Sequence, residues 1–497
     1  MSYQYRPPEG EKPFTPKPKM DAFAAMIFWI VAAISAGAFM FQVSIHGLLP
    51  TRYRLILLGI LALFLLAVGL VIFGKNLKHK KRYGSMVLLG FFIAFTLLAN
   101  WYLFTGFGTL GRITAAQSDQ VVDFSFVTHK ESPIQHTSQL NSTKVLAALT
   151  QDAELLVDYL PQIEEEWNAD LNFEDTGDYL AGAKRLLEDK KEPLLLNEAY
   201  RSLVEEQYPN FFNETTVVSR ESLTIKNEEA EGTEVEVVQK NDSFVAYISG
   251  IDTQGPVSTI SRSDVNIVMA VNPNTREILM LSIPRDTYVP IAGGGNDQYD
   301  KLTHAGIYGI SSSVETLENL LDVDINYHAK VNFTSLVRMV DVLGGIEVDN
   351  PRYFSGGGYE FPEGINYLEG EEALAFSRER YQLADGDVGR GANHLRVIQA
   401  MINKAISPSI LLNYNSVLSV AEEAMETNMP KKKIVELIND QIDRNDRWEF
   451  KNTELSGYGT MGSPSYAMPG YELYMYELYD ESVDEVQKTF KDFLDAR

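Results

Sequence analysis

The sequence contains no cysteine among its 497 residues. Disulfide bonds, thiol catalysis and cysteine-ligated metal sites are therefore excluded. Histidine is scarce too: there are seven, and none stands in the HExxH spacing of zinc hydrolases. Lysine and arginine number 43 against 68 acidic residues, giving a net charge of −25. This balance argues against a nucleic-acid-binding surface on the bulk of the protein.

Long apolar runs are present, and they lie near the N-terminus. They cover Ala22–Ile45, Leu55–Phe73 and Ser85–Phe104, each close to the ~20 residues needed to span a bilayer. Because no small-residue cleavage pattern separates them, a cleavable signal peptide is a poor interpretation. We predict three transmembrane helices within residues 22–105 and hence a bilayer as a partner. A buried apolar hairpin in a soluble fold is the alternative.

The basic residues around these runs predict their orientation. The segment 74–84, between the second and third runs, carries Lys75, Lys78, Lys80, Lys81 and Arg82. Loops rich in lysine and arginine stay in the cytoplasm, and the tail 1–21 is also basic. Arg52 and Arg54 in the first loop oppose this orientation but are outnumbered. We therefore predict a multi-pass cell-membrane protein with a cytoplasmic N-terminus and an extracellular region after Gly106.

Residues 114–232 are acidic and polar, without a glycine-rich loop, metal cluster or nucleophile motif. A strand-like run at Val121–Val127 precedes amphipathic helical stretches at Lys144–Trp167 and Tyr179–Lys190. We predict a small α/β accessory domain without chemistry, in which Glu164–Glu166 form a solvated helix face. The acidic run 228–236 marks its end.

Residues 233–497 alternate strand and helix patterns, which predicts α/β layers. The runs Val265–Val271 and Ile278–Ile283, joined by the turn-like NPNT, predict a hairpin. Ser312, three residues before Glu315, predicts a helix start by a capping box. A helix beginning at Thr334 or Ser335 should stop at Gly344–Gly345. The remaining predicted helices cover Glu371–Ala375, Asn393–Ala405, Ser416–Glu426 and a final stretch from Ser482.

Charged residues stand at the ends of the predicted strands: Asp252, Arg262, Asp264, Arg285 and Asp286. Buried strands hold side chains in fixed directions, so charges at their ends can meet in one pocket. Acids together with arginines fit a divalent cation beside a phosphate-bearing ligand. Salt bridges at strand ends are the alternative.

Further basic residues follow in three motifs. Lys301 lies in DKLTHAG, and Arg378 and Arg380 in FSRERY share one face if that segment is extended. GDVGRGANHLRVIQ carries Arg390 and His394 where a glycine-rich segment begins a helix, and helix N-termini favour anions. The concentration of these cations in one α/β region favours a polyanion site over scattered surface pairs.

Several of these motifs together, in this order, resemble the LytR-CpsA-Psr family over about residues 249–405. They are GID, SRSD, PRD, DKLTHAG, NFTSLVRMVDVLGGIEV, LEGEEALAFSRERY and GDVGRGANHLRVI. The three membrane segments and the accessory domain resemble the CpsA (capsule) branch of that family. The resemblance implies an α/β/α sandwich in residues 233–497, with a hydrophobic pocket for the prenyl chain of a polyprenyl pyrophosphate.

The resemblance also implies residue roles. Asp252 and Asp264 would bind Mg²⁺, with Mn²⁺ as an alternative, beside the pyrophosphate. The residues implied to hold the pyrophosphate oxygens are Arg262, Arg285, Lys301, Arg378, Arg380, Arg390 and His394. Arg285, Asp286, Arg378 and Arg380 form the implied catalytic set, and Asp286 or Asp264 would take the acceptor proton. Many family members carry glutamine where His394 stands.

The implied activity is transfer of a lipid-pyrophosphate-linked capsular or wall polysaccharide to peptidoglycan, releasing polyprenyl phosphate. Its implied partners are the lipid-linked polysaccharide, peptidoglycan and other capsule-assembly membrane proteins, without nucleic acid. Two other functions stay open: a membrane regulator that senses lipid-linked glycan, and a phosphatase that uses water as the acceptor. The apolar stripe Val337, Val340, Val342 and Leu343 either lines the lipid pocket or belongs to the core.

Overall fold

The structure is a computed structural model. It describes residues 20–47, 49–74, 79–115, 119–141, 143–226, 242–251, 257–380, 382–383, 386–407 and 414–496. The chain divides into two compact units, Met1–Phe107 and Gly108–Arg497.

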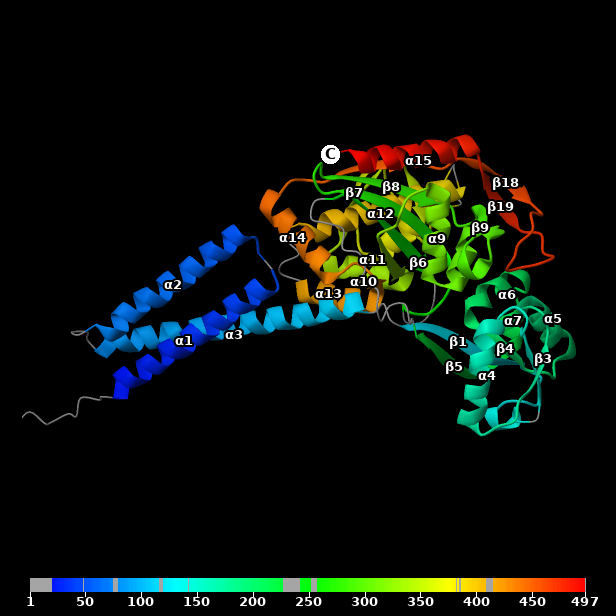
Figure 1. The fold of residues 1–497 in the computed structure, drawn as a ribbon, viewed down its shortest axis with the longest axis horizontal. Coiled ribbons are helices and arrows are strands. Elements are labelled where there is room, and N and C mark those ends of the chain that lie inside the picture. The colour runs from blue at the N-terminus through cyan, green and yellow to red at the C-terminus, as the bar shows by residue number, and fades with distance from the viewer. Residues whose placement is uncertain are drawn as a thin grey trace, which may run out of the picture. The chain divides into compact units, whose positions relative to one another are not determined.

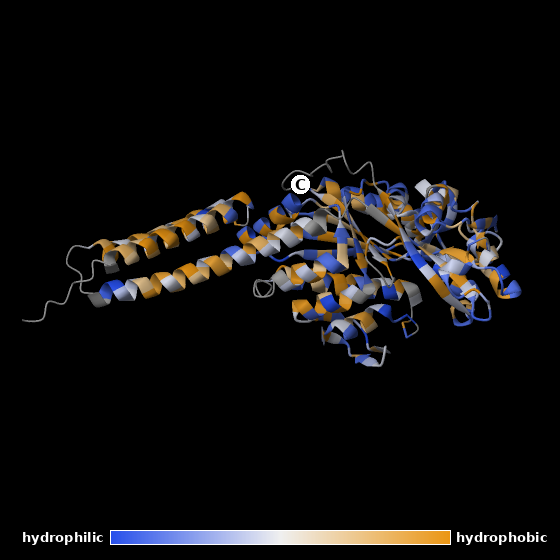
Figure 2. Ribbon diagram, turned by 90° about the horizontal axis from the view of Figure 1, so that it is seen from below, coloured by the Kyte–Doolittle hydropathy of each residue, from blue (hydrophilic) through white to orange (hydrophobic). Residues whose placement is uncertain are grey.

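The first unit is built on long apolar helices, as predicted. They are α1 (Met20–Ile45), α2 (Thr51–Phe73) and α3 (His79–Ala115), and α3 continues past the end of the unit. Apolar residues run along all three helices (Figure 2). Three spans, Phe23–Ile45, Thr51–Phe73 and Lys81–Gly111, are long and apolar enough to cross a membrane.

Polar contacts tie these helices together among the apolar residues. The Trp29 indole N–H donates to the Leu65 carbonyl oxygen at 2.8 Å and joins α1 to α2. The hydroxyl oxygens of Ser35 and Thr96 lie 2.8 Å apart and join α1 to α3. Inside a bilayer such groups have no water to bond with, so pairing across helices satisfies them.

The predicted basic loop at residues 74–84 is shorter than expected. Helix α3 begins at His79, so Lys80, Lys81 and Arg82 belong to its first turn, while residues 75–78 lie outside the described ranges. Lysine and arginine are good helix formers, and their long side chains can reach past a helix end toward water. Basic composition therefore did not separate loop from helix.

The accessory region contains a five-stranded sheet of order β3-β2-β4-β1-β5. Its strands are β1 (Asp119–His129), β2 (Lys144–Ala147), β3 (Asn172–Asp175), β4 (Leu194–Asn197) and β5 (Thr215–Lys226). Its helices are α4 (Ala153–Trp167), α5 (Tyr179–Asp189), α6 (Arg201–Gln207) and α7 (Phe211–Glu214). The prediction of helix from Lys144 was wrong, because the buried run Val145–Ala147 pairs in parallel with β3 and β4.

The second sheet has six strands in the order β16-β11-β6-β7-β8-β17. They are β6 (Phe244–Ile251), β7 (Ser263–Asn272), β8 (Glu277–Ile283), β11 (Tyr327–Asn332), β16 (Met425–Thr427) and β17 (Glu449–Thr453). Strands β7 and β8 pair antiparallel across residues 273–276, which confirms the predicted hairpin. Strand β11 runs parallel to β6, and β17 runs parallel to β8.

Helices cover both faces of this sheet. Val268 and Ala270 of β7 pack with α9 (Ile310–Leu321) and α15 (Asp480–Asp495). Ile267 and Met269, which point to the opposite face, pack with α12 (Gly386–Ala405). Figure 1 shows α15 above the sheet and α10 to α13 below it. The arrangement is an α/β/α sandwich, the predicted fold class.

Smaller elements complete the unit. The strands are β9 (Tyr288–Ile291), β10 (Gln298–Lys301), β12 (Ile346–Asn350), β13 (Phe354–Gly356), β14 (Tyr359–Phe361), β15 (Gly364–Leu368), β18 (Gly457–Met461) and β19 (Tyr474–Leu478). The helices are α8 (Leu302–Ala305), α10 (Phe333–Leu343), α11 (Gly370–Arg378), α13 (Tyr414–Ala424) and α14 (Lys431–Arg444). The predicted helix Ser416–Glu426 is too long by its last two residues, since Met425 begins β16.

Two predicted helix ends had different outcomes. Helix α10 stops before Gly344 and Gly345, whose φ angles of 77° and 79° confirm the predicted glycine stop. Helix α9 begins at Ile310, so Ser312 is not its cap. The Ser312 hydroxyl instead donates to the Ala292 carbonyl oxygen at 2.6 Å. The Ser312 side chain thus bonds a residue distant in sequence instead of forming the predicted capping box with Glu315.

The accessory core continues into the C-terminal part of the chain. It includes four buried residues around the β18–β19 hairpin: Ala467, Met468, Leu473 and Met475. Polar contacts reinforce this packing. The Gln151 side-chain amide donates to the Ala467 carbonyl oxygen at 3.2 Å, and the Tyr208 and Tyr471 hydroxyl oxygens lie 3.2 Å apart.

Candidate functional site

Charged side chains meet where β7 begins and β8 ends. Because the two strands are antiparallel, with Asn266 opposite Ile283, Asp264 and Arg285 come to the same edge. Arg285 Nη1 donates to Asp264 Oδ1 at 3.0 Å. Thr303 Oγ1 donates to the same oxygen at 3.3 Å. The hairpin register therefore produces the first ion pair of the site.

Lys301 brings a second cation to this edge. Its Nζ lies 3.0 Å from Asp286 Oδ1, and its side chain is only 7% exposed. Arg285 Nε lies 3.8 Å from Asp286 Oδ2. Ion pairs thus link four residues in a row: Asp264, Arg285, Asp286 and Lys301. We call these four residues, together with Arg262 and Arg390, the cation cluster.

A buried carboxylate holds the Lys301 backbone in place. Asp300 is fully buried, and its Oδ1 accepts from the Lys301 backbone N–H and from Ser465 Oγ, both at 2.8 Å. His304 Nδ1 lies 2.8 Å from the same oxygen. Burial would raise the pKa of Asp300, but His304 and the hydrogen bonds from the Ala467 N–H and Ser465 outweigh burial and hold the pKa below its ordinary value. His304 therefore supports the loop rather than the ligand site.

Gly306 lets two site segments approach closely. A Cβ at this position would lie 2.5 Å from the Ser261 carbonyl oxygen and 2.7 Å from the Ser263 backbone nitrogen. No side chain larger than hydrogen fits there without a shift of backbone. The last residue of DKLTHAG is thus glycine because the loop packs directly against SRSD, which carries Arg262 and Asp264.

The surrounding cations keep Asp264 ionised. Burial opposes its charge, but Arg262, Arg285 and Arg390 and the hydrogen bond from Arg285 outweigh burial, so the pKa of Asp264 lies below its ordinary value. Arg262 and Arg390 therefore contribute to the electrostatics at Asp264, as expected for a shared polyanion site. Arg390 lies in the first turns of α12.

A small apolar cavity adjoins this edge. Val265, the neighbour of Asp264, lines it with residues of β6, β11, α10 and α12, and Ser377 and His394 are among its few polar members. Burial, and then the charge of Arg390, lower the pKa of His394 to about 3. His394 is therefore a neutral ring on an apolar wall throughout the physiological pH range.

The predicted lipid-lining stripe is largely core. Val340 is fully buried and packs with Ile346 and Phe376, and Leu343 is 5% exposed. Leu336 of the same helix lines the apolar cavity instead. The helix was placed correctly, and of the two interpretations left open the structure supports core packing for Val340 and Leu343, because α10 packs on both the sheet and α11.

The remaining predicted site residues are placed as follows. Arg378 is the exposed last residue of helix α11, so FSRERY is not wholly extended as the two-residue spacing assumed. Arg380 follows two residues later and is half-buried. Ser377 lines the apolar cavity, and Arg378 is the next residue in the sequence. Asp252, the predicted metal ligand, lies outside the described residues.

Two charged residues near the cluster escaped the sequence analysis. Glu206 of α6 lies 3.4 Å from Arg262 Nη1 and 3.9 Å from Lys301 Nζ, so the accessory region supplies a carboxylate to the cluster. Lys330 of β11 donates to the Thr259 carbonyl oxygen at 2.6 Å, and burial lowers its pKa to about 8. Lys330 could have been found from the sequence, because a lysine inside the strand-like HAKVN is unusual. The sequence held no signal for Glu206.

The donor set was tested for a divalent cation. Within the described ranges there is no group of three His, Cys, Asp or Glu residues that could hold a metal. Asp264, whose pKa lies below its ordinary value, is an oxygen donor of the kind that Mg²⁺ prefers. It is the one predicted metal ligand within the described ranges, so the Mg²⁺ site stays a prediction.

Comparisons with known proteins show the family of this chain. The model of the LytR_cpsA_psr family matches residues 210–492. A Bacillus subtilis protein named polyisoprenyl-teichoic acid–peptidoglycan teichoic acid transferase TagU is 35% identical over 259 residues, or 52% of this chain and 80% of the relative. The Enterococcus faecalis protein of the same name is 36% identical over 227 residues, or 45% and 73%.

Solved structures show the same similarity. The crystal structure of Bacillus subtilis TagU is 34% identical in sequence and has a TM-score of 0.42. The match covers 52% of this chain and 98% of the solved one.

Proposed function

Because the chain belongs to the LytR-CpsA-Psr family, we propose that it transfers a sugar-phosphate from a polyprenyl-pyrophosphate-linked polysaccharide to a peptidoglycan hydroxyl. The observation that carries the proposal is the cation cluster beside an apolar cavity. A ligand with two phosphates on an apolar chain has matching chemistry. The relatives named for transfer of polyisoprenyl-linked teichoic acid to peptidoglycan support the same reaction class.

The proposed step exchanges one P–O bond for another. The acceptor hydroxyl oxygen forms a bond to the phosphorus that bears the sugar. The bond from that phosphorus to the bridging oxygen breaks, and polyprenyl monophosphate leaves with the electron pair. Such phosphoryl transfers depend mainly on positioning and charge neutralisation, which the cluster can supply without a covalent enzyme intermediate.

Individual residues take distinct parts in this proposal. Arg285 and Lys301 neutralise the phosphate oxygens, assisted by Arg262, Arg390, Arg378, Arg380 and the His394 ring on the cavity wall. Asp286, which pairs with Lys301, or Asp264, which pairs with Arg285, takes the acceptor proton. A Mg²⁺ or Mn²⁺ ion held by Asp264 with Asp252 would neutralise further phosphate charge.

The glycan and the membrane arrangement are also part of the proposal. The three apolar helices and the CpsA-type order of segments favour a capsular or wall polysaccharide, an extracellular unit Gly108–Arg497 and contact with other capsule-assembly proteins. The absence of native cysteine allows a clean test of orientation. With Tyr367→Cys, at a tyrosine 75% exposed, a membrane-impermeant thiol reagent should label intact cells. Labelling only after lysis would place this unit in the cytoplasm.

Activity can be tested with the full chain in nanodiscs. The assay supplies polyprenyl-pyrophosphate-linked radiolabelled glycan, Mg²⁺ and peptidoglycan fragments, with Arg378→Ala as the comparison. Metal-dependent label on peptidoglycan that Arg378→Ala loses is the expected result. Label released into water would favour the phosphatase, and tight lipid binding without turnover would favour the sensor.

A further inference from the structure

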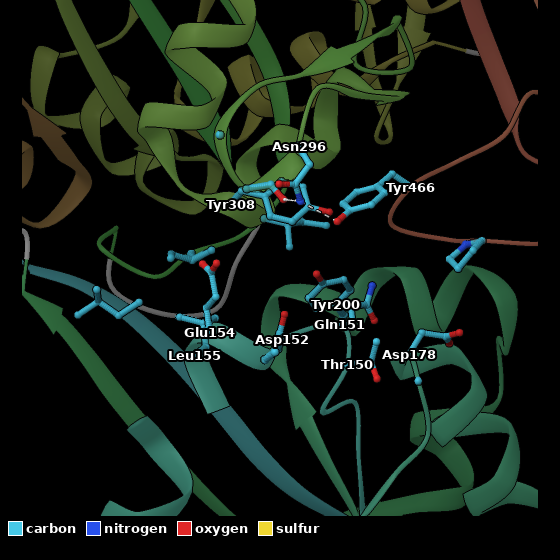
Figure 3. A pocket seen from close by; sticks show the side chains of 18 residues that line it. Thr150, Gln151, Asp152, Glu154, Leu155, Asp178, Tyr200, Asn296, Tyr308 and Tyr466 are labelled. Carbon is cyan, nitrogen blue, oxygen red and sulfur yellow. Dashed lines mark hydrogen bonds between the residues drawn. The ribbon is translucent and has the colours of Figure 1, made fainter. Parts of the chain in front are cut away.

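A second concave surface lies within the unit Gly108–Arg497. This cleft of about 620 Å³ is bordered on one side by the start of α4, including Gln151 and Glu154. On the other side lie the loop around Asn296 and the rings of Tyr308 and Tyr466. Figure 3 shows these side chains facing a common space. We call it the tyrosine cleft.

The tyrosine cleft has the opposite charge character to the cation cluster. Three acidic residues, Asp152, Glu154 and Asp178, are among the described residues that line it, and lysine, arginine and histidine are absent from that set. Asp178 caps α5 by accepting from the Ala181 N–H at 2.7 Å, which fixes one of these charges in place. Such a lining repels phosphates and other anions. Its ligand should therefore not be an anion.

Aromatic surface is the second property of the cleft. The rings of Tyr308 and Tyr466 have centroids 6.4 Å apart and an angle of 44° between their planes. Tyr466 is 41% exposed, and Asn296 Nδ2 donates to its hydroxyl oxygen at 2.9 Å. A Cβ at Gly294 would lie 2.8 Å from the Tyr308 ring, so the glycine lets this ring rest on the loop backbone.

Two residues that line the cleft are close in sequence to segments of the cation cluster. Ile260 and Ile307 line it, and each is a near neighbour of a segment already described. Ile260 lies two residues before Arg262, and Ile307 follows Gly306, which packs against the Ser261–Ser263 backbone. A ligand bound at the cluster would thus have the cleft next to it.

We propose that the tyrosine cleft binds an uncharged oligosaccharide. Sugar rings combine an apolar C–H face, which stacks on aromatic rings, with hydroxyl groups that donate to carboxylates and amides. Tyr308, Tyr466, Asn296 and Glu154 offer this combination. The inference deepens the proposed function, on which it rests, by assigning a saccharide subsite beside the pyrophosphate site.

Binding alone tests the subsite without requiring transfer. Saturation-transfer NMR on the full chain in nanodiscs would measure chitotetraose, cellotetraose and maltotetraose, with a glycerol-phosphate oligomer as the anionic comparison. We expect saturable binding of at least one uncharged probe and about tenfold weaker binding for Tyr466→Ala. Asn296→Gly should weaken binding severalfold; Asn296 has φ 52°, so glycine removes the side chain without backbone strain.

Tyr367→Ala is the matched control, because this exposed tyrosine is not among the described residues lining the cleft, and it should bind like the unchanged protein. Failure of all three uncharged probes would overturn the subsite, as would equal binding by Tyr466→Ala and Tyr367→Ala. Preference for the anionic oligomer would also overturn it. Saccharide binding with no transfer of glycan to peptidoglycan would overturn the proposed function alone.

Discussion

The cation cluster and the tyrosine cleft share neighbouring segments of chain but differ in every property that selects a ligand. The cluster places Arg285 and Lys301 among ionised carboxylates, whereas the cleft has acids and tyrosines with no basic residue among its described lining. A phosphate is attracted to the first and repelled by the second. The contrast teaches that a substrate with a charged linkage and a neutral glycan can be oriented by charge alone.

The largest effect should come from removing the central cation. Arg285→Ala leaves Asp264 and Asp286 without this partner and removes a donor to the phosphate oxygens. We expect glycan transfer to peptidoglycan to fall by about 10²-fold or more. Arg338→Ala, at an exposed arginine paired with Glu423, is the control and should retain activity. Normal transfer by Arg285→Ala, in the same nanodisc assay, would remove the cluster from the proposed reaction.

A smaller effect should follow from separating the two segments that both surfaces use. Gly306→Ala forces a Cβ against the Ser261 carbonyl oxygen. We expect about 2 kcal/mol of destabilisation and roughly tenfold slower transfer, because such overpacking costs about 1–3 kcal/mol. Thermal unfolding and transfer rates would measure both. Gly84→Ala lies within helix α3, where a Cβ meets nothing within 4 Å, and should neither slow transfer nor lower stability.

Glu206 offers a way to sharpen the charge contrast. Its carboxylate lies near Arg262 and Lys301 and competes with a bound pyrophosphate. Glu206→Gln should lower KM for the lipid-linked donor about threefold at low ionic strength, and less in high salt because the side chain is exposed. Glu205→Gln, one residue earlier, should have no such effect. A raised KM would show that Glu206 positions the cations instead.

The smallest effect should come from His394→Gln. Its folded pKa of about 3 lies below the ordinary 6.5, so the unfolded chain binds more protons between these values. When the pH falls from 6.5 to 5.5, the free energy of unfolding of the unchanged protein should drop by about 1 kcal/mol. The variant should not show this drop. Denaturant unfolding at the two pH values measures this. Transfer between pH 7 and 8 should stay the same, and a shifted pH profile there would give His394 a proton-transfer role.

Much of this architecture could be predicted from local patterns. Two apolar, β-branched runs joined by the turn-like NPNT predicted the β7–β8 hairpin, and antiparallel pairing then brings Asp264 and Arg285 together. The glycine stop of α10 was equally local. Such features depend on residues close in sequence, so the local sequence pattern is enough to predict them.

Other features depend on partners far along the chain. Ser312 has a good capping pattern, yet its hydroxyl bonds Ala292, twenty residues earlier. Glu206 reaches Arg262 from helix α6 of the accessory region, and Asp300 is satisfied by Ser465 and the Ala467 N–H. No periodicity encodes these contacts, because they arise only when the layers pack.

The shared core of the accessory sheet and the β18–β19 hairpin has an evolutionary consequence. Ala467, Met468, Leu473 and Met475 pack into a core built mainly from residues more than two hundred positions earlier. A gene rearrangement that gained or lost the accessory region alone would expose these side chains to water. The two distant stretches should therefore be inherited as one unit, and lineages that lack the first should carry a different C-terminal hairpin.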